Sequence, residues 1–268
     1  MKEIMVITGA TSGIGKQVAL SLDKKEDVDE IWAIARSKEN LEALQSEFKN
    51  KIVPIPLDLS DLDSIKEYQR LLKENDVNIK VLANCAGFGI FDHTENIDPA
   101  IIENMINLNC SALALMISYS LPYLKENSYI MNIASVAAFQ PIPYINCYAA
   151  TKSFVLSYSR ALRKELKYRK IHVTAVTPFW TKTKFFDRAI AKEKKEVVIK
   201  YVAMYDPKDV ANKAVKDLYK NKEISCYGFI SNAQRILVGM LPKKMVMNTW
   251  LRQQKLDGTK DIRANSNK

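Results

Sequence analysis

Three side chains near the middle of the sequence have the types and spacing of an acid–base site. Tyr148 is the only one of twelve tyrosines with a lysine four residues later, Lys152. This spacing puts both side chains on one helix face. An ammonium group beside a phenol lowers the phenol's pKa from its usual value of about 10, so we expect Tyr148 to exchange protons. Ser135 could meet the same substrate oxygen. The alternative for Tyr148 and Lys152 is a plain surface contact, which is the commoner role of a Tyr/Lys pair.

A second group of residues has the spacing of an anion-binding turn. The stretch "TGATSGIG" places Gly9, Gly13 and Gly15 directly after an apolar run and before residues with helical periodicity. Glycines there allow a tight bend, close approach of backbone amides to a pyrophosphate, and close packing of helix on strand. The alternative for any lone glycine-rich match is a simple loop.

The elements that must position these residues are apolar runs that alternate with amphipathic stretches. The runs cover residues 3–8, 30–35, 52–59, 81–87, 128–135, 172–178 and 224–230. This alternation predicts a three-layer α/β fold of Rossmann type, a doubly wound parallel sheet of about seven strands with helices on both faces. We expect one domain over residues 1–268, a substrate lid over 182–209 and a C-terminal extension over 236–268.

Composition narrows the class of protein. The chain has 268 residues, 47% of them hydrophobic, and a net charge of +10. Its lysines are spread without an aromatic-interleaved basic stripe, so we expect no nucleic-acid binding. Four cysteines without a C-x-x-C pair indicate reduced thiols and a cytoplasmic location, and two histidines make a metal site improbable. Because we find neither a leader nor an uncharged apolar run near about 18 residues, we expect no secretion or membrane span.

Together these motifs resemble the short-chain dehydrogenase/reductase family, from Thr8 to about Thr183. The family's T-G-x-x-x-G-x-G stands as "TGATSGIG", and its N-N/C-A-G element as "NCAG" at residues 84–87. Its catalytic Ser and Y-x-x-x-K stand as Ser135 and Tyr148 with Lys152, thirteen and four residues apart. Four motifs in the family's order are far more specific than one. Within the family, the chain is most similar to the branch of 3-oxoacyl reductases and hydroxysteroid dehydrogenases.

The resemblance implies roles for the residues that match. Tyr148 would be the acid/base, Ser135 would hold the substrate oxygen, and Lys152 would depress the tyrosine pKa and bind the nicotinamide ribose. A catalytic asparagine would anchor a water, and we choose Asn109 over Asn107 by its distance from Pro122. The implied cofactor-binding residues, besides Tyr148 and Lys152, are Gly9, Thr11, Ser12, Gly13, Ile14, Gly15, Arg36, Ser37, Asp58, Leu59, Asn84, Ala86, Gly87, Pro178, Thr181 and Thr183.

The end of the second strand favours NADP(H) over NAD(H). An NAD enzyme places a carboxylate there for the ribose hydroxyls, whereas this chain has Ala35, Arg36 and Ser37. An arginine attracts a 2′-phosphate. Asp58 matches the family's adenine-contacting acid, with the alternative of a turn aspartate.

The substrate side departs from the family pattern. Where the family has P-G-x-x-x-T, the chain reads Pro178-Phe179-Trp180-Thr181-Lys182-Thr183, so an aromatic pair stands beside the predicted site. Apolar loop residues predict a large cavity for a small hydrophobic carbonyl or alcohol substrate: Phe88, Phe91, Phe139, Ile142, Tyr144, Trp180, Phe185 and Phe186. The tail "GMLPKKMVMNTWLRQQ" either completes this pocket or a subunit interface, which we favour, or contacts a membrane.

The leading functional hypothesis is an NADP(H)-dependent oxidoreductase for a hydroxysteroid, bile acid or acyl ketone. Alternatives are an epimerase or dehydratase of the same fold, or a redox sensor that binds dinucleotide without turnover. Asn109 and the lack of a large substrate domain argue against an epimerase or dehydratase, although Ser135, Tyr148 and Lys152 do not exclude one. A sensor would be expected to lose part of the catalytic set, and this chain keeps all of it. We also expect a homo-oligomer, a dimer or tetramer, because the helix that carries Tyr148 has a second apolar face with Phe154 and Leu162.

Overall fold

The strands form where consecutive apolar residues are buried on both faces of one sheet. In this computed structural model, which describes residues 1–189 and 197–256, Ile4 to Ile7 are fully buried, as in parallel strands covered on both sides. The strands are β1 (Lys2–Thr8), β2 (Glu30–Ala35), β3 (Lys51–Pro56), β4 (Val77–Asn84), β5 (Leu124–Ile133), β6 (His172–Val176) and β7 (Ile224–Ser225).

All seven strands pair in parallel in the order β3-β2-β1-β4-β5-β6-β7. The chain therefore reverses direction across the sheet between β1 and β4, which is the switch point of a doubly wound fold. The prolines Pro54 and Pro56 lie on β3, an edge strand, where a missing N–H is tolerated. The predicted fold class is confirmed.

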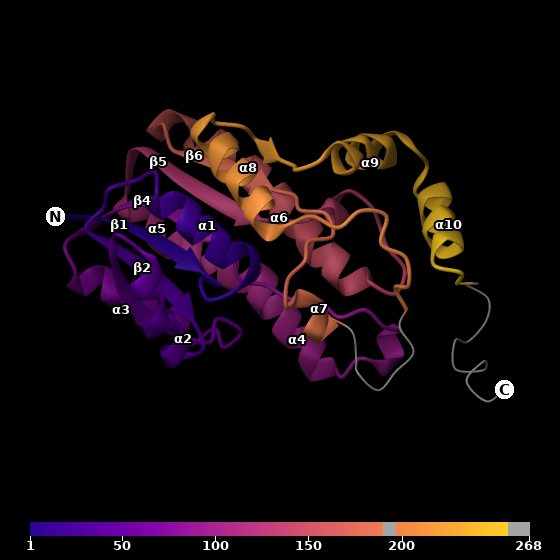
Figure 1. Ribbon diagram of the computed structural model, residues 1–268, viewed down its shortest axis with the longest axis horizontal. Coiled ribbons are helices and arrows are strands. Elements are labelled where there is room, and N and C mark those ends of the chain that lie inside the picture. The colour runs from indigo at the N-terminus through magenta and orange to yellow at the C-terminus, as the bar shows by residue number, and fades with distance from the viewer. Residues whose placement is uncertain (190–196, 257–268) are drawn as a thin grey trace.

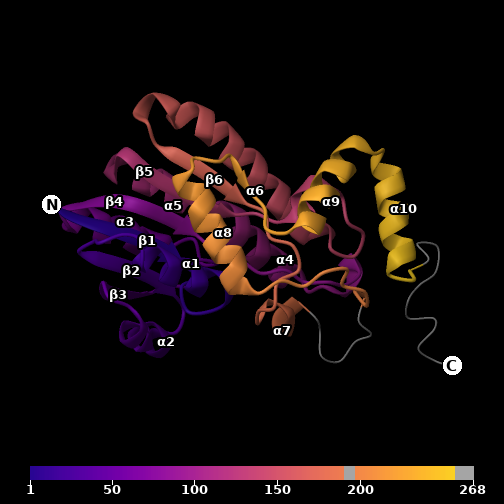
Figure 2. The same cartoon turned by 45° about the horizontal axis from the view of Figure 1, so that its top comes forward.

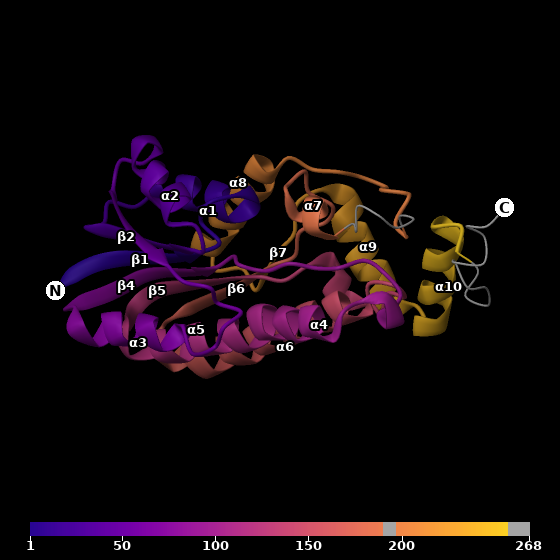
Figure 3. The same ribbon diagram turned by 90° about the horizontal axis from the view of Figure 1, so that it is seen from below.

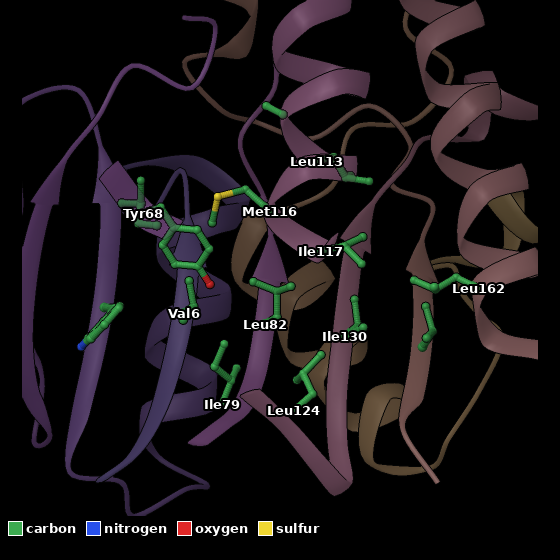
Figure 4. Packing of buried hydrophobic residues seen from close by; sticks show 14 of the residues in the cluster. Val6, Tyr68, Ile79, Leu82, Leu113, Met116, Ile117, Leu124, Ile130 and Leu162 are labelled. Atoms are coloured by element: carbon green, nitrogen blue, oxygen red, sulfur yellow. The ribbon is translucent and has the colours of Figure 1, made fainter. Parts of the chain in front are cut away.

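Helices cover both faces of the sheet, as Figures 1 and 3 show. On one face, α3, α5 and α6 pack with the sheet around a core that includes Tyr68, Leu82 and Met116 (Figure 4). On the other face, α1, α2 and α8 enclose a second core. The helices are α1 (Gly13–Asp23), α2 (Lys38–Glu42), α3 (Ile65–Glu74), α4 (Pro99–Ile106), α5 (Leu113–Ser120), α6 (Asn146–Glu165), α7 (Phe185–Ala189), α8 (Pro207–Tyr219), α9 (Phe229–Met240) and α10 (Lys243–Gln253).

The helical stretch Pro99–Tyr123, which contains α4 and α5, is long and apolar enough by composition to cross a membrane. In the fold it belongs to a layer that covers the sheet, and Met116 and Ile117 of α5 are fully buried in the core. A π-helical turn, Asn107–Ala112, joins α4 to α5. Such turns frequently mark functional sites, and this one carries Asn109.

The last predicted strand is shorter than the apolar run suggested. It ends at Ser225, and Gly228, with a φ of +90°, turns the chain into α9. A Cβ atom at Gly228 would overlap the ring of Tyr205, so the turn needs glycine. The helices α9 and α10 then form an arm at the end of the molecule opposite the N-terminus (Figures 1 and 2).

Two predicted segments are only partly described. Residues 190–196 of the predicted lid and 257–268 of the predicted extension lie outside the described residues.

Of the predicted partner face on α6, Leu162 is buried in the chain's own core, and Phe154 stays 40% exposed and stacks on Tyr158. The part of the oligomerisation argument that rested on Leu162 was therefore wrong.

Candidate active site

The glycine turn lies between β1 and α1 and is closed by backbone contacts. Gly9 and Gly13 have φ values of +66° and +54°, which residues with a side chain rarely adopt. A Cβ atom at Gly15 would overlap the carbonyl oxygen of Gly9. The side chain of Ser12 does not cap α1, and Ser12 and Gly13 line the cavity described below. The first-turn N–H groups of a helix have no partner within the helix, so this end of α1 can bind an anion.

The loop after β4 is held against the glycine turn. The hydroxyl of Thr8 accepts hydrogen bonds from the backbone N–H groups of Cys85 and Ala86, both at 3.0 Å. A Cβ atom at Gly9 would lie 3.0 Å from Ala86, and one at Gly87 would lie 3.2 Å from Nζ of Lys152. Thr8 and Cys85 were not among the predicted site residues, although Thr8 is the first letter of the glycine motif.

The predicted acid–base residues meet in one cavity. Tyr148 and Lys152 come from the first turns of α6, and Ser135 follows the end of β5. Nζ of Lys152 lies 5.7 Å from the centre of the Tyr148 ring and donates a hydrogen bond to the backbone oxygen of Ile133 at 2.8 Å. The hydroxyl of Ser135 accepts a hydrogen bond from the N–H of Ala137 at 3.1 Å, which fixes its position.

Burial dominates the electrostatics of this pair. It raises the pKa of Tyr148 to about 12, against the opposing effect of a hydrogen bond with Ser135. Burial also lowers the pKa of Lys152 to about 8. The expectation of a Tyr148 pKa below its usual value of about 10 was wrong, because burial of the phenol is the largest cause of its shift and raises it.

Asn109 is almost completely buried, and its side chain is held on both sides. Its Nδ2 donates to the backbone oxygen of Phe88 at 2.8 Å and to the hydroxyl of Thr151 at 3.0 Å, and its Oδ1 accepts from the N–H of Phe88 at 3.1 Å. Asn109 therefore ties the loop after β4 to α6, beside Lys152. Thr151 was missed, because no local sequence signal marks it.

The cavity has a volume of about 430 Å³ and is lined by aromatic side chains, which we name the aromatic wall, as well as by the glycine turn. Six of the eight predicted apolar residues line it: Phe88, Phe91, Ile142, Trp180, Phe185 and Phe186. Phe139 instead packs against the sheet core, and the ring of Tyr144 contacts His93, so neither lines the cavity. Phe179, which stands where the family has glycine, also lines the cavity beside Trp180.

The helix α10 completes the aromatic wall. Trp250 stacks on Trp180 with ring centres 6.5 Å apart and donates a hydrogen bond from its indole N–H to the backbone oxygen of Pro143. The carboxamide of Gln254, almost fully buried, accepts from the N–H groups of Ile199 and Lys200 at 3.0 Å. Neither Trp250 nor Gln254 was among the predicted site residues.

Most predicted cofactor-binding residues line this cavity. They are Gly9, Ser12, Gly13, Ile14, Gly15, Arg36, Ala86, Gly87, Tyr148, Lys152, Pro178, Thr181 and Thr183. Thr11 and Leu59 do not line it, and Leu59 is buried in the core.

Three polar residues of the predicted set are also outside the cavity lining. The amide of Asn84 donates to Asn132 within the sheet. Asp58 accepts from the N–H and hydroxyl of Ser60, as the alternative of a turn aspartate predicts. Ser37 caps α2 through the N–H of Asn40.

The glycine cradle, the uncapped start of α1 and Arg36 at the end of β2 fit a dinucleotide cofactor. A parallel sheet that reverses beside such a turn defines a Rossmann-type dinucleotide-binding domain. Tyr148, Lys152 and Ser135 add a proton-transfer group at the same cavity.

Comparison with known proteins supports the same class of protein. The family model for short chain dehydrogenases matches residues 3–194. The chain is 33% identical over 190 residues to a very-long-chain 3-oxoacyl-CoA reductase of Danio rerio, covering 67% of this chain and 60% of the relative. It is 32% identical over 217 residues to an NADP-dependent 3-hydroxy acid dehydrogenase of Schizosaccharomyces pombe, covering 77% and 83%. The chain thus spans about 60% of the length of the Danio rerio relative.

Among solved structures, a short-chain dehydrogenase from Sphingobium yanoikuyae in complex with NADPH superposes with a TM-score of 0.73 at 24% identity. That match covers 91% of this chain and 97% of the other. The chain belongs to the short-chain dehydrogenase family of oxidoreductases, and the resemblance seen in its motifs is confirmed.

Proposed function

We propose that this chain is an NADP(H)-dependent oxidoreductase that interconverts a carbonyl and a secondary alcohol on a hydrophobic substrate. The observation that carries the proposal is the convergence of Tyr148, Ser135 and Lys152 on the cavity that the glycine turn also lines. A dinucleotide held by the turn and a substrate held by the aromatic wall would therefore meet beside the phenol. When bound, the nicotinamide supplies or accepts a hydride.

Each polar side chain has a separate role in this proposal. With a pKa of about 12, Tyr148 keeps its proton at neutral pH and can donate it to a substrate carbonyl oxygen during reduction. The hydroxyl of Ser135 orients that oxygen. Lys152 stabilises the phenolate that remains after proton transfer, and Asn109 holds the loop at Phe88 in place. The water relay assigned to Asn109 by resemblance stays a prediction.

The substrate class follows from the character of the wall. Six large apolar side chains and the indole of Trp250 surround a cavity of about 430 Å³, which suits a bulky lipid-like ketone or alcohol. Hydroxysteroids, bile acids and acyl ketones have this character. The names of relatives, which include very-long-chain 3-oxoacyl-CoA reductases and a hydroxysteroid dehydrogenase-like protein, support the same class. A homo-oligomer and a cytoplasmic location stay predictions.

The role of Tyr148 is tested with Tyr148→Phe. We expect turnover to fall about 10²–10⁴-fold, because the proton donor is lost, while NADPH affinity by calorimetry stays unchanged. Turnover is followed by NADPH absorbance over ketosteroids, bile acids, acyl ketones and small aldehydes. Tyr144→Phe is the matched control, since Tyr144 lies outside the cavity lining. Undiminished turnover in Tyr148→Phe would contradict the proposed acid/base role.

The choice of nucleotide is tested at Arg36. This side chain is exposed at the end of β2, and among the described residues that line the cavity none carries a carboxylate that would repel a 2′-phosphate. We expect Arg36→Ala to weaken NADPH binding about tenfold and to leave NADH binding nearly unchanged. Lys38→Ala is the control, because Lys38 pairs with Glu42 and does not line the cavity. Equal weakening of both nucleotides would refute a phosphate-reading role for Arg36.

A further inference from the structure

The outer face of α9 is entirely apolar. Six residues at helical spacing point away from the rest of the chain and are exposed: Phe229, Ile230, Ala233, Ile236, Leu237 and Met240. Phe229 is 86% exposed and Met240 79% exposed. The opposite face of α9 carries the buried Ser231 and Val238, and Gln234 there lines the cavity. We name the six exposed residues the α9 stripe.

No described part of the chain covers the α9 stripe. The helix lies at the edge of the molecule in Figures 1 and 2. An apolar stripe of this length on a helix marks an interaction site.

The charge around the stripe indicates what its partner is. From Ile224 to Leu256 the chain contains five lysine and arginine residues and no aspartate or glutamate. Immediately beyond the stripe, Lys244, Asn248 and Arg252 share one face of α10 and line a surface hollow of about 320 Å³ with Thr249 and Met245. Two cations with an amide and a hydroxyl have the chemistry to bind an anionic phosphate or carboxylate headgroup.

We propose that the arm formed by α9 and α10 binds the surface of a bilayer that contains anionic lipids. The α9 stripe enters the boundary between headgroups and acyl chains, and the cationic face of α10 contacts the headgroups. A second copy of the chain is a poorer partner for the same face, because symmetric pairing would bring two acid-free, positively charged arms together. The tail considered for membrane contact starts at Gly239, and the α9 stripe begins ten residues earlier, at Phe229.

The arm also forms part of the cavity wall. Gln234 of α9 and Trp250 of α10 line the cavity. They lie on the faces of these helices that point away from the α9 stripe and from the surface hollow on α10. A bilayer bound to the arm would therefore lie close to the aromatic side of the cavity. Binding to the bilayer does not depend on catalysis, so it can be tested separately from the proposed function.

The test is co-sedimentation of the full chain with vesicles of phosphatidylcholine alone and of phosphatidylcholine mixed equally with phosphatidylserine. We expect binding to the mixed vesicles that weakens as salt is added. Phe229→Ser combined with Met240→Ser should reduce the partition coefficient at least about tenfold. Tyr168→Ser is the matched control, because Tyr168 is 82% exposed and lies in the short 3-10 helix that follows α6.

The contribution of charge is tested with Lys244→Ala combined with Arg252→Ala. We expect a loss of about fivefold for each cation on the mixed vesicles and little change on phosphatidylcholine. Lys24→Ala combined with Lys73→Ala changes the net charge equally at exposed positions elsewhere and should bind like the parent chain.

Three results would overturn the proposal. One is no binding to the mixed vesicles by a chain that is folded by circular dichroism. Another is an equal loss of binding in the Tyr168→Ser control. The third is a shift to a smaller oligomer in the Phe229/Met240 variant by light scattering, which would make the stripe an interface between copies.

Discussion

The two sides of the cavity are built from different parts of the chain. On the nucleotide side, Gly9, Gly13 and Gly15 bring backbone against backbone, and Thr8 bonds to two N–H groups of the neighbouring loop. On the substrate side, the wall consists of aromatic side chains from segments far apart in the sequence. Phe91 and Trp250 both lie there, although 159 residues separate them.

This difference predicts how each side responds to change. Backbone contacts leave no space for an added atom, so the nucleotide side should fail with the smallest substitution. In a wall of side chains, one ring can be replaced without moving the backbone. Substitutions on the substrate side should therefore change which substrate is preferred and leave the fold of the chain intact.

The largest effect is expected for Gly15→Ala. The added methyl group would overlap the carbonyl oxygen of Gly9 and approach Cβ of Cys85. We expect a loss of stability of about 3 kcal/mol or more in urea denaturation, and no measurable NADPH binding by calorimetry. Gly239→Ala is the control, since nothing lies within 4 Å of the position that its methyl group would take, and it is inside α9.

Gly239→Ala should raise the free energy of unfolding by about 0.5–1 kcal/mol, because alanine is favoured over glycine within a helix. Similar stability changes at Gly15 and Gly239 would mean that the glycine turn is not closed by backbone contact. The comparison between the two sides would then lose its first half.

The second effect concerns Lys152, which lies where the two sides meet. Burial lowers its pKa from the usual 10.5 to about 8. Between these values the unfolded chain holds a proton that the folded chain has released, so stability rises with pH in that window. Tyr148, with its pKa raised to about 12, has the opposite effect, but only above about pH 10. The gain from Lys152 is thus visible between pH 8 and 10.

The measurement compares the parent chain with Lys152→Met, which lacks this titration. From pH 7 to pH 10, the stability of the parent relative to the variant should rise by up to about 3 kcal/mol. Lys24→Met, at an exposed position, should follow the parent at every pH. If the parent and Lys152→Met give parallel curves, the lysine titrates normally and is not desolvated as the structure implies.

The sequence predicted the nucleotide side better than the substrate side for a physical reason. The residues of the glycine turn are neighbours in sequence, and each φ requirement leaves a glycine that can be read directly. The sheet followed from the apolar alternation, and the position of the turn at its carboxyl edge followed from parallel topology. Even there, Asn84 was assigned to the cofactor, and its amide instead bonds to Asn132 inside the sheet.

The substrate side depends on contacts that no local pattern contains. Trp250 reaches the oxygen of Pro143 across 107 residues, and Gln254 holds the N–H of Lys200 across 54. Phe139 and Tyr144 stand in the predicted loops but turn to other partners. Apolar character therefore identified the kind of wall, and tertiary packing decided which aromatic residues belong to it.

The smallest of these effects is expected for Trp250→Ala, on the substrate side. The change removes the ring that stacks on Trp180 and the hydrogen bond to Pro143. We expect KM for bulky ketones to rise about tenfold, a loss of about 1.4 kcal/mol, because part of the apolar wall is lost. NADPH affinity and turnover of a small aldehyde should stay unchanged, because α10 supplies none of the residues of the glycine turn or the loop after β4.

The variant Trp250→Phe separates the two contributions of the indole. It keeps an aromatic ring against Trp180 and loses the N–H that bonds to Pro143, so its KM should fall between those of the parent and the alanine variant. If Trp250→Ala weakened NADPH binding as much as substrate binding, the two sides would be energetically coupled through the cavity. Independence of the two binding constants, in contrast, would mean that the aromatic wall can vary while the backbone cradle stays the same.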